Sequence, residues 1–124
     1  MKIYKGKAFT RFARKEKISD KKLCELIQRA EAGKIDADLG GGVIKQRLAR
    51  DNQGKSGGYR TIVLYRQQDR AFFIYGFAKS DEENISAEDE TVFRKLAVTV
   101  LNLPQEALQK QIEAGYFTEV VYDR

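Results

Sequence analysis

The stretch VIKQRLARDNQGKSGGYRTIVLYRQQDRAFFIYGFAK, residues 43–79, decides the fold of this chain. It contains three strand-like runs, 43–49, 59–66 and 70–78, which are separated by turn-forming residues. The last run is apolar at odd and even positions alike, as expected for a central strand that is covered on both faces. We therefore predict three adjacent antiparallel strands, joined by a wide hairpin loop and then by a tighter turn.

The same stretch is also the cationic part of the chain. It holds eight basic and two acidic side chains, whereas residues 1–42 and 80–124 carry net charges of +5 and −6 that nearly cancel. The whole chain has a net charge of +5. A positive sheet surface favours a polyanionic partner, and nucleic acid is the obvious candidate.

Lys45 and Arg47 are the first candidates for binding such a partner. Alternation along the first strand places them on one face and puts Ile44 and Leu48 on the other. Because the apolar pair is expected to face the core, the basic pair is predicted to point away from it.

Arg60 begins the adjacent strand directly after a pair of glycines, which permit close approach of another backbone. Its position in the strand is unusual for a functional arginine, because Ile62 and Leu64 share its face and have the character of core residues. A β-bulge at the two glycines, residues 57–58, would redirect the arginine.

Three tyrosines, Tyr59, Tyr65 and Tyr75, lie among these charges and offer stacking surfaces for unpaired bases. The alternative is a solvated basic face with no ligand, since lysine and arginine are common on protein surfaces. The recurrence of Lys45 and Arg47 at strand spacing favours binding.

Two helices are predicted before the strands. Residues 7–15 have a short amphipathic pattern with a basic polar side. A second pattern begins after Ser19, a good N-cap residue, and ends at Gly33.

Two more helices are predicted after the strands. Ser86 with Asp89 three residues later resembles a capping box, and an apolar stripe follows it. Pro104 suits the first turn of a further short helix, which Gly115 ends. Residues 116–123 are predicted to form a last strand or an extended arm.

Composition excludes several classes of protein. At 124 residues the chain fits one domain, and it has no histidine and a single cysteine, Cys24. Zinc sites and internal disulfides are therefore excluded. Histidine, the usual catalytic acid and base near neutral pH, is also missing. The acidic residues at 81–90 are expected to complement a helix dipole rather than to bind magnesium. No signal peptide or membrane span is recognisable, so we expect a cytoplasmic protein.

Three segments, GGGVIKQRLAR (40–50), GKSGGYRTIVLY (54–65) and FFIYGFAKSDEENIS (72–86), resemble the RelE/HigB family of toxins from type II toxin-antitoxin modules. The resemblance is greatest to the phage-associated branch with an extended C-terminus. It implies a single RelE-like toxin domain over residues 1–124. It also implies an α+β fold with two N-terminal helices, a twisted antiparallel sheet of three to four strands, and C-terminal helices packed on the sheet.

The resemblance also implies an activity. Members of this family typically cut messenger RNA in the ribosomal A site, without a metal or other cofactor, by driving the ribose 2′-OH onto the adjacent phosphate. Lys45 and Arg47 match the family's cationic strand pair, Arg60 its GYR arginine, and Lys79 its basic residue after the third strand. Arginine can stabilise the phosphorane but cannot exchange protons. A lysine among arginines loses proton affinity, so Lys45 is the candidate base, and Lys79 would act as the acid or hold the phosphate.

Further RNA contacts are expected from Arg50, Lys55, Tyr59 and Tyr65. The chain departs from the family in two ways. Ile85 occupies the region in which several members have a tyrosine, and there is no histidine. Either another tyrosine takes the place of the missing one, or base stacking and proton transfer are divided among different residues than in those members.

Two other functions remain open at this point. A non-enzymatic toxin of the same fold, similar to the ParE inhibitors of DNA gyrase, is one, and an inactive relic that binds only RNA or an antitoxin is the other. The expected partners are messenger RNA, the ribosome and a cognate antitoxin, which we expect to be a helix-turn-helix protein encoded next to this gene. No membrane partner is expected.

Overall fold

The computed structural model describes residues 1–49, 58–80 and 84–121. The elements follow in the order β1 (Lys2–Gly6), α1 (Lys7–Lys15), α2 (Asp20–Glu31), β2 (Ala37–Gly40), β3 (Val43–Leu48), β4 (Tyr59–Arg66), β5 (Arg70–Ala78), α3 (Ala87–Val100), α4 (Gln105–Glu113) and β6 (Phe117–Glu119). The α+β class, the two N-terminal helices and the two C-terminal helices are confirmed. Within the described ranges, no helix has the length and apolar character that a membrane span requires.

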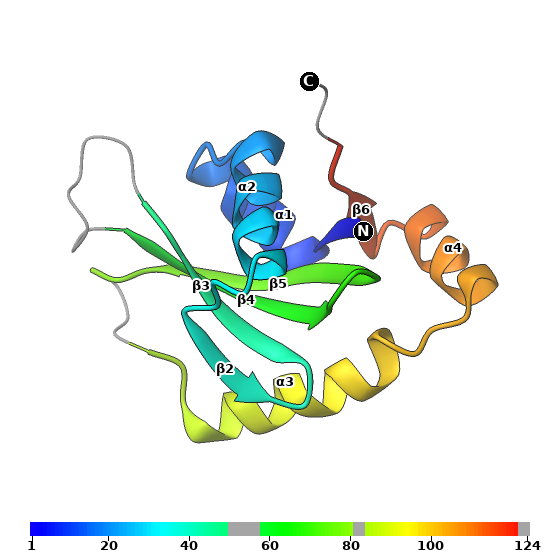
Figure 1. Ribbon diagram of the computed structural model, residues 1–124. Coiled ribbons are helices and arrows are strands. Elements are labelled where there is room, and N and C mark those ends of the chain that lie inside the picture. Colours follow the sequence, from blue (N-terminus) through cyan, green and yellow to red (C-terminus); the bar gives the residue numbers. More distant parts are fainter. Residues whose placement is uncertain (50–57, 81–83, 122–124) are drawn as a thin grey trace.

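The sheet has six strands in the order β2-β3-β4-β5-β1-β6 (Figure 1). The three predicted strands β3, β4 and β5 lie side by side in it and pair antiparallel. The sheet is larger than the predicted three to four strands because short segments add to both edges. It is also mixed, since β1 pairs in parallel with β5.

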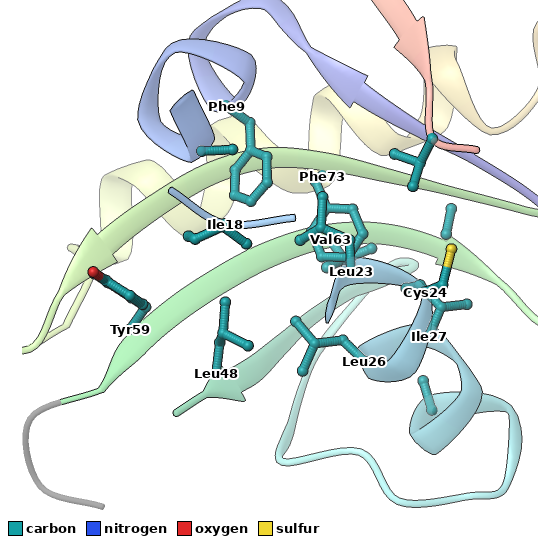
Figure 2. Close-up of a cluster of buried hydrophobic side chains, with 14 of the residues drawn as sticks. Phe9, Ile18, Leu23, Cys24, Leu26, Ile27, Leu48, Tyr59, Val63 and Phe73 are labelled. Atoms are coloured by element: carbon teal, nitrogen blue, oxygen red, sulfur yellow. The ribbon is translucent and has the colours of Figure 1, made fainter. Parts of the chain in front are cut away.

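Helices cover both faces of this sheet. In Figure 1, α1 and α2 lie on one face and α3 lies on the other. Figure 2 shows the α1–α2 side, where Phe9 and Leu23 pack against Val63 and Phe73 of the sheet. The α3 side has a separate apolar cluster that includes strand residues Val43, Ile62, Leu64 and Phe72 and helix residues Ala97 and Val100. The free thiol of Cys24 is buried.

The predicted starts of α2 and α3 are confirmed by local contacts. The Ser19 and Ser86 hydroxyls each accept a hydrogen bond from the backbone N–H three residues later, at 3.3 and 3.1 Å. Gly41 and Gly42 form the turn between β2 and β3, and both of them and Gly40 have positive φ angles. A Cβ atom on Gly42 would come within 2.6 Å of the Leu101 side chain, so the turn packs closely against the end of α3.

A β-bulge interrupts the pairing of β4 with β5. Val63 pairs with Phe73, but the preceding residue Ile62 pairs with Tyr75, so Ile74 is an extra residue in β5. A single extra residue exchanges the two faces of a strand. Phe73 packs under α1, whereas Tyr75 belongs to the α3 side. The bulge thus transfers Tyr75 to the face that carries Arg60.

Candidate functional site

Two transverse rows of side chains define the candidate site at one end of the sheet. From β3 through β4 to β5, the rows are Arg47–Arg60–Phe77 and, one step toward the middle of the sheet, Lys45–Ile62–Tyr75. Side chains directly opposite on one face have Cβ atoms about 4.5–5.5 Å apart. Strand register therefore brings Lys45, Arg47 and Arg60 together, and these three residues are called the cationic site below.

Arg60 is largely buried, with 8% of its surface exposed. Its guanidinium Nη1 donates to the Tyr59 carbonyl oxygen at 3.3 Å. Arg60 lies on the same face of the sheet as Ile62 and Leu64, as alternation along the strand predicts, and it lies at the end of their apolar cluster. The described part of β4 places Arg60 on the candidate site's face without a redirecting bulge, and the irregularity in this pair of strands lies in β5 instead.

Lys45 is directed toward the segment that precedes α3. Its Nζ donates to Asn84 Oδ1 at 3.2 Å, and the same oxygen accepts the Ile85 backbone N–H at 2.9 Å. Ile85 is buried in the cluster on the α3 side. The residue that stands in the region of the family's tyrosine is therefore an apolar anchor near Lys45.

Tyr75 supplies an aromatic ring to this face. It is half-buried, and its ring centroid lies 5.8 Å from that of Phe77 and 6.0 Å from that of Phe93 on α3. Sequence reasoning could not assign Tyr75 to this face, because only the bulge at Ile74 places it there.

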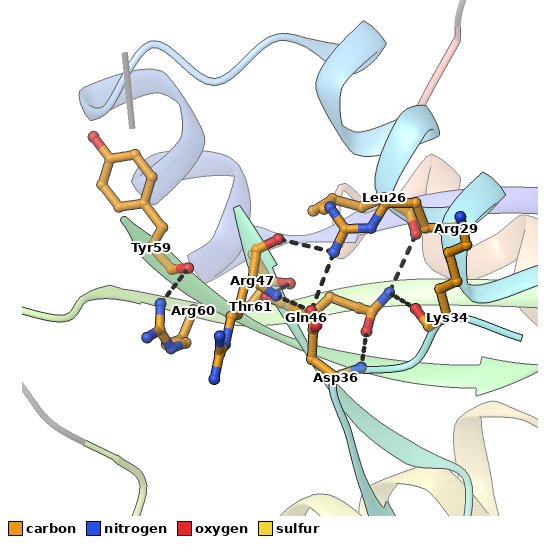
Figure 3. A network of polar contacts seen from close by, with 9 residues as sticks. All are labelled: Leu26, Arg29, Lys34, Asp36, Gln46, Arg47, Tyr59, Arg60 and Thr61. Carbon is orange, nitrogen blue, oxygen red and sulfur yellow. Dashed lines mark hydrogen bonds and ion pairs between the residues drawn. The ribbon is translucent and has the colours of Figure 1, made fainter. Parts of the chain in front are cut away.

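Gln46 anchors the strand between the two basic residues of β3. Its side chain is fully buried on the opposite face (Figure 3), where Oε1 accepts the Asp36 backbone N–H at 2.8 Å. Its Nε2 donates to the carbonyl oxygens of Leu26 and Lys34 at 3.3 and 3.2 Å. Because neighbouring residues of a strand point to opposite faces, a fixed Gln46 directs Lys45 and Arg47 to the candidate site.

A hollow of about 380 Å³ opens beside the cationic site. It is lined by Arg29, Asp36, Arg47, Leu48, Ala49 and Arg60. Three of these six residues are arginines and one is acidic, so the hollow suits an anionic group. Sequence reasoning missed Arg29, Asp36 and Gln46, which come from other segments or looked like ordinary surface residues.

Lys79 lies just beyond the end of β5 and is exposed. Its backbone N–H donates to the Gly58 carbonyl oxygen at 3.1 Å, which extends the pairing of β4 and β5 by one residue. Alternation then puts Lys79 on the face of Phe77, one step past the row that contains Arg60. Arg50 and Lys55, two predicted RNA contacts, lie outside the described residues.

Tyr59 and Tyr65 lie on the opposite face of the sheet, under α1 and α2. Tyr59 is 4% exposed, and its hydroxyl donates to Glu16 Oε1 at 2.7 Å. The Tyr65 hydroxyl donates to Glu31, and burial together with this carboxylate raises the pKa of Tyr65. The structure gives no support to the prediction that these two tyrosines stack on RNA, because both are directed away from the cationic site.

The described residues, 1–49, 58–80 and 84–121, contain no cluster of three or more acidic, cysteine or histidine side chains that could hold a metal ion. The described side chains of the cationic site and Tyr75 supply guanidinium, ammonium and aromatic groups on this face. Together they provide positive charge for a phosphate next to an aromatic surface for a base.

A family model described as "RelE toxin of RelE / RelB toxin-antitoxin system" matches residues 1–120. No curated protein matches the chain.

Proposed function

The chain belongs to the RelE family of toxins, and from that premise we propose that it is an endoribonuclease that cleaves messenger RNA at the ribosome without a metal ion. The observation that carries the proposal is the pairing of Arg47 with Arg60, with Lys45 on the same face. Three cationic side chains at adjacent positions can surround one phosphodiester.

The proposed reaction is a transfer within one dinucleotide. The ribose 2′-oxygen attacks the adjacent phosphorus, the bond from phosphorus to the 5′-oxygen breaks, and the products carry a 2′,3′-cyclic phosphate and a 5′-hydroxyl. Arg47 and Arg60 stabilise the charge that develops on the phosphorane oxygens. Lys45 accepts the 2′-OH proton. Lys79 protonates the leaving 5′-oxygen, or it holds the phosphate while a water molecule supplies that proton.

Several members of the family have a tyrosine in the region that Ile85 occupies here, and Tyr75 is our candidate for the residue that takes its role in this chain. It lies in the same row as Lys45 and beside Phe93, so a base next to the reacting phosphate could stack there. Single-stranded RNA is commonly bound by such a combination of aromatic rings and basic side chains.

The remaining assignments follow from this function. A toxin of a RelE/RelB system has a cognate antitoxin, and we propose that a helix-turn-helix protein encoded beside this gene fills that role. Because the proposed target is messenger RNA at the ribosome, we propose that the protein acts in the cytoplasm. We also propose that residues 1–124 act as one toxin domain and belong to the phage-associated branch of the family.

The proposal is tested by inducible expression with and without the product of the adjacent gene. We expect growth arrest from the toxin alone, new 5′ ends within messenger RNA by primer extension, and recovery of growth on co-expression. Intact transcripts with altered plasmid supercoiling would instead favour a gyrase inhibitor. Normal growth and intact transcripts would favour an inactive relic.

A further inference from the structure

Among the described residues, no strand pairs with the outer edge of β3 where Arg47 lies. β2 pairs with β3 only between Val43 and Lys45, and beyond this point β3 is bonded through its other edge to β4. The free N–H and C=O groups of an edge strand need partners, and without them the strand end frays.

Asp36 and Arg29 supply these partners to a single residue. Asp36 Oδ2 accepts the Arg47 backbone N–H at 2.7 Å, and Arg29 Nη2 donates to the Arg47 carbonyl oxygen at 3.2 Å. The same Arg29 nitrogen donates to Asp36 Oδ2 at 3.1 Å, so the two side chains are joined by an ion pair. Together they substitute for a strand along one residue of β3 (Figure 3).

The pair is itself held by the interior of the protein. The Asp36 backbone is bonded to the buried Gln46 side chain, and Arg29 projects from the last turn of α2. The Gln46 carbonyl oxygen also accepts the Thr61 hydroxyl of β4 at 3.0 Å. Helix α2, the segment before β2 and strand β4 are thus connected at the position of Arg47.

Arg47 needs such support more than an average edge residue does. Its direct neighbour across the strands is Arg60, and opposed like charges push the two strands apart. An error of about 1 Å in the position of a group that stabilises a transition state can lower a rate about 100-fold.

We propose that Asp36 and Arg29 are positioning residues that hold the Arg47 backbone so that its guanidinium stays beside that of Arg60. This inference rests on the proposed function, since it concerns the same site. The two residues act through Arg47 and need not touch the RNA.

A double-mutant cycle on the cleavage rate tests the proposal. Asp36→Ala should lower kcat about 10-fold or more in the wild-type background, but less than about 2-fold in the Arg47→Ala background, because the group it positions is then missing. Asp36→Asn should recover much of the rate, since its amide oxygen can still accept the Arg47 N–H. Asp38→Ala is the matched control: Asp38 accepts the Gly40 backbone N–H at 2.9 Å, a comparable bond that does not involve Arg47.

Equal losses from Asp36→Ala in both backgrounds would overturn the inference, as would a loss of the same size from Asp38→Ala. Hydrogen exchange of the Arg47 amide gives a readout that is independent of RNA, and Asp36→Ala should accelerate it. Should Arg47→Ala cleave as fast as the wild type, the proposed active site is wrong, while amide exchange still decides whether the pair holds the Arg47 backbone. Unchanged exchange in Asp36→Ala would refute that role.

Discussion

Arg47 and Arg60 occupy directly opposite positions on β3 and β4 and share one face of the sheet. Two like charges in this arrangement destabilise a sheet by up to about 1 kcal/mol. Burial of most of Arg60 adds a desolvation cost. Such a pair is unfavourable for folding alone, and it is what a site for a phosphate would require.

The first prediction concerns this conflict between stability and function. Arg47→Gln should leave the melting temperature unchanged or raise it, because the repulsion is relieved, while RNA cleavage falls. Arg66→Gln is the control: Arg66 also lies opposite an arginine, Arg70, but it donates to Asp69 and Asn102. That variant should not gain stability and should retain cleavage. A clear loss of stability in Arg47→Gln would contradict this account.

The second prediction concerns Tyr75. Tyr75→Leu should weaken binding of a short single-stranded RNA by about 1–3 kcal/mol, because base stacking on the ring is lost, whereas Tyr75→Phe should bind nearly as well as the wild type. Quenching of a 2-aminopurine base in the RNA reports the stacking directly. If the leucine variant quenches as strongly as the wild type, Tyr75 is only a packing residue.

The third prediction concerns salt. Affinity for RNA should fall steeply as ionic strength rises, because phosphate contacts release counterions. Arg47→Ala should reduce the magnitude of the slope of log K against log salt concentration by about 1, as expected for one lost phosphate contact. Lys110→Ala, an exposed lysine on α4, should not alter it. If Arg47→Ala has the same slope as the wild type, the basic face is solvated and does not contact RNA phosphates through Arg47.

The fourth prediction concerns Tyr65 and pH. Burial, with the bond to Glu31, raises the Tyr65 pKa from its ordinary value of 10. The folded protein thus holds this proton more tightly than the unfolded chain does. The resulting stability is fully present below pH 10 and is lost as the pH rises further. Urea denaturation between pH 9 and about 11 should show that the free energy of unfolding declines less steeply with pH in Tyr65→Phe than in the wild type. Tyr116→Phe, at an exposed position, is the control. Parallel declines in the wild type and Tyr65→Phe would show that Tyr65 does not contribute.

The parts of the fold that the sequence predicts are those set by local patterns. Strand β3 follows from alternation, β5 follows from its continuous apolar run, and turn residues separate β3, β4 and β5. The starts of α2 and α3 follow from Ser19 and Ser86. Strands β1, β2 and β6 have only three to five residues each, and their pairing depends on distant parts of the chain. No local pattern could indicate that β1 lies parallel to β5.

The same distinction applies to the site. Parity alone places Lys45 and Arg47 on one face, and it also puts Tyr59 and Tyr65 on the face opposite Arg60. Proximity in sequence to basic residues therefore does not indicate which face of the sheet these tyrosines occupy. Other features depend on tertiary contacts. The bulge that redirects Tyr75 and the contacts of Asp36 with Arg47 arise only when the strands and α2 are assembled.

The most direct test of the proposed function is primer extension on ribosome-bound messenger RNA with purified protein. The wild type should produce new 5′ ends, and both Lys45→Ala and Arg60→Leu should reduce them by about 100-fold or more. The first variant lacks the base that accepts the 2′-OH proton, and the second lacks a cation that stabilises the phosphorane. Leucine keeps much of the apolar packing of buried Arg60, and melting curves confirm that each variant is folded. Lys110→Ala should cleave as the wild type does. Undiminished cleavage by folded Lys45→Ala and Arg60→Leu would contradict the account.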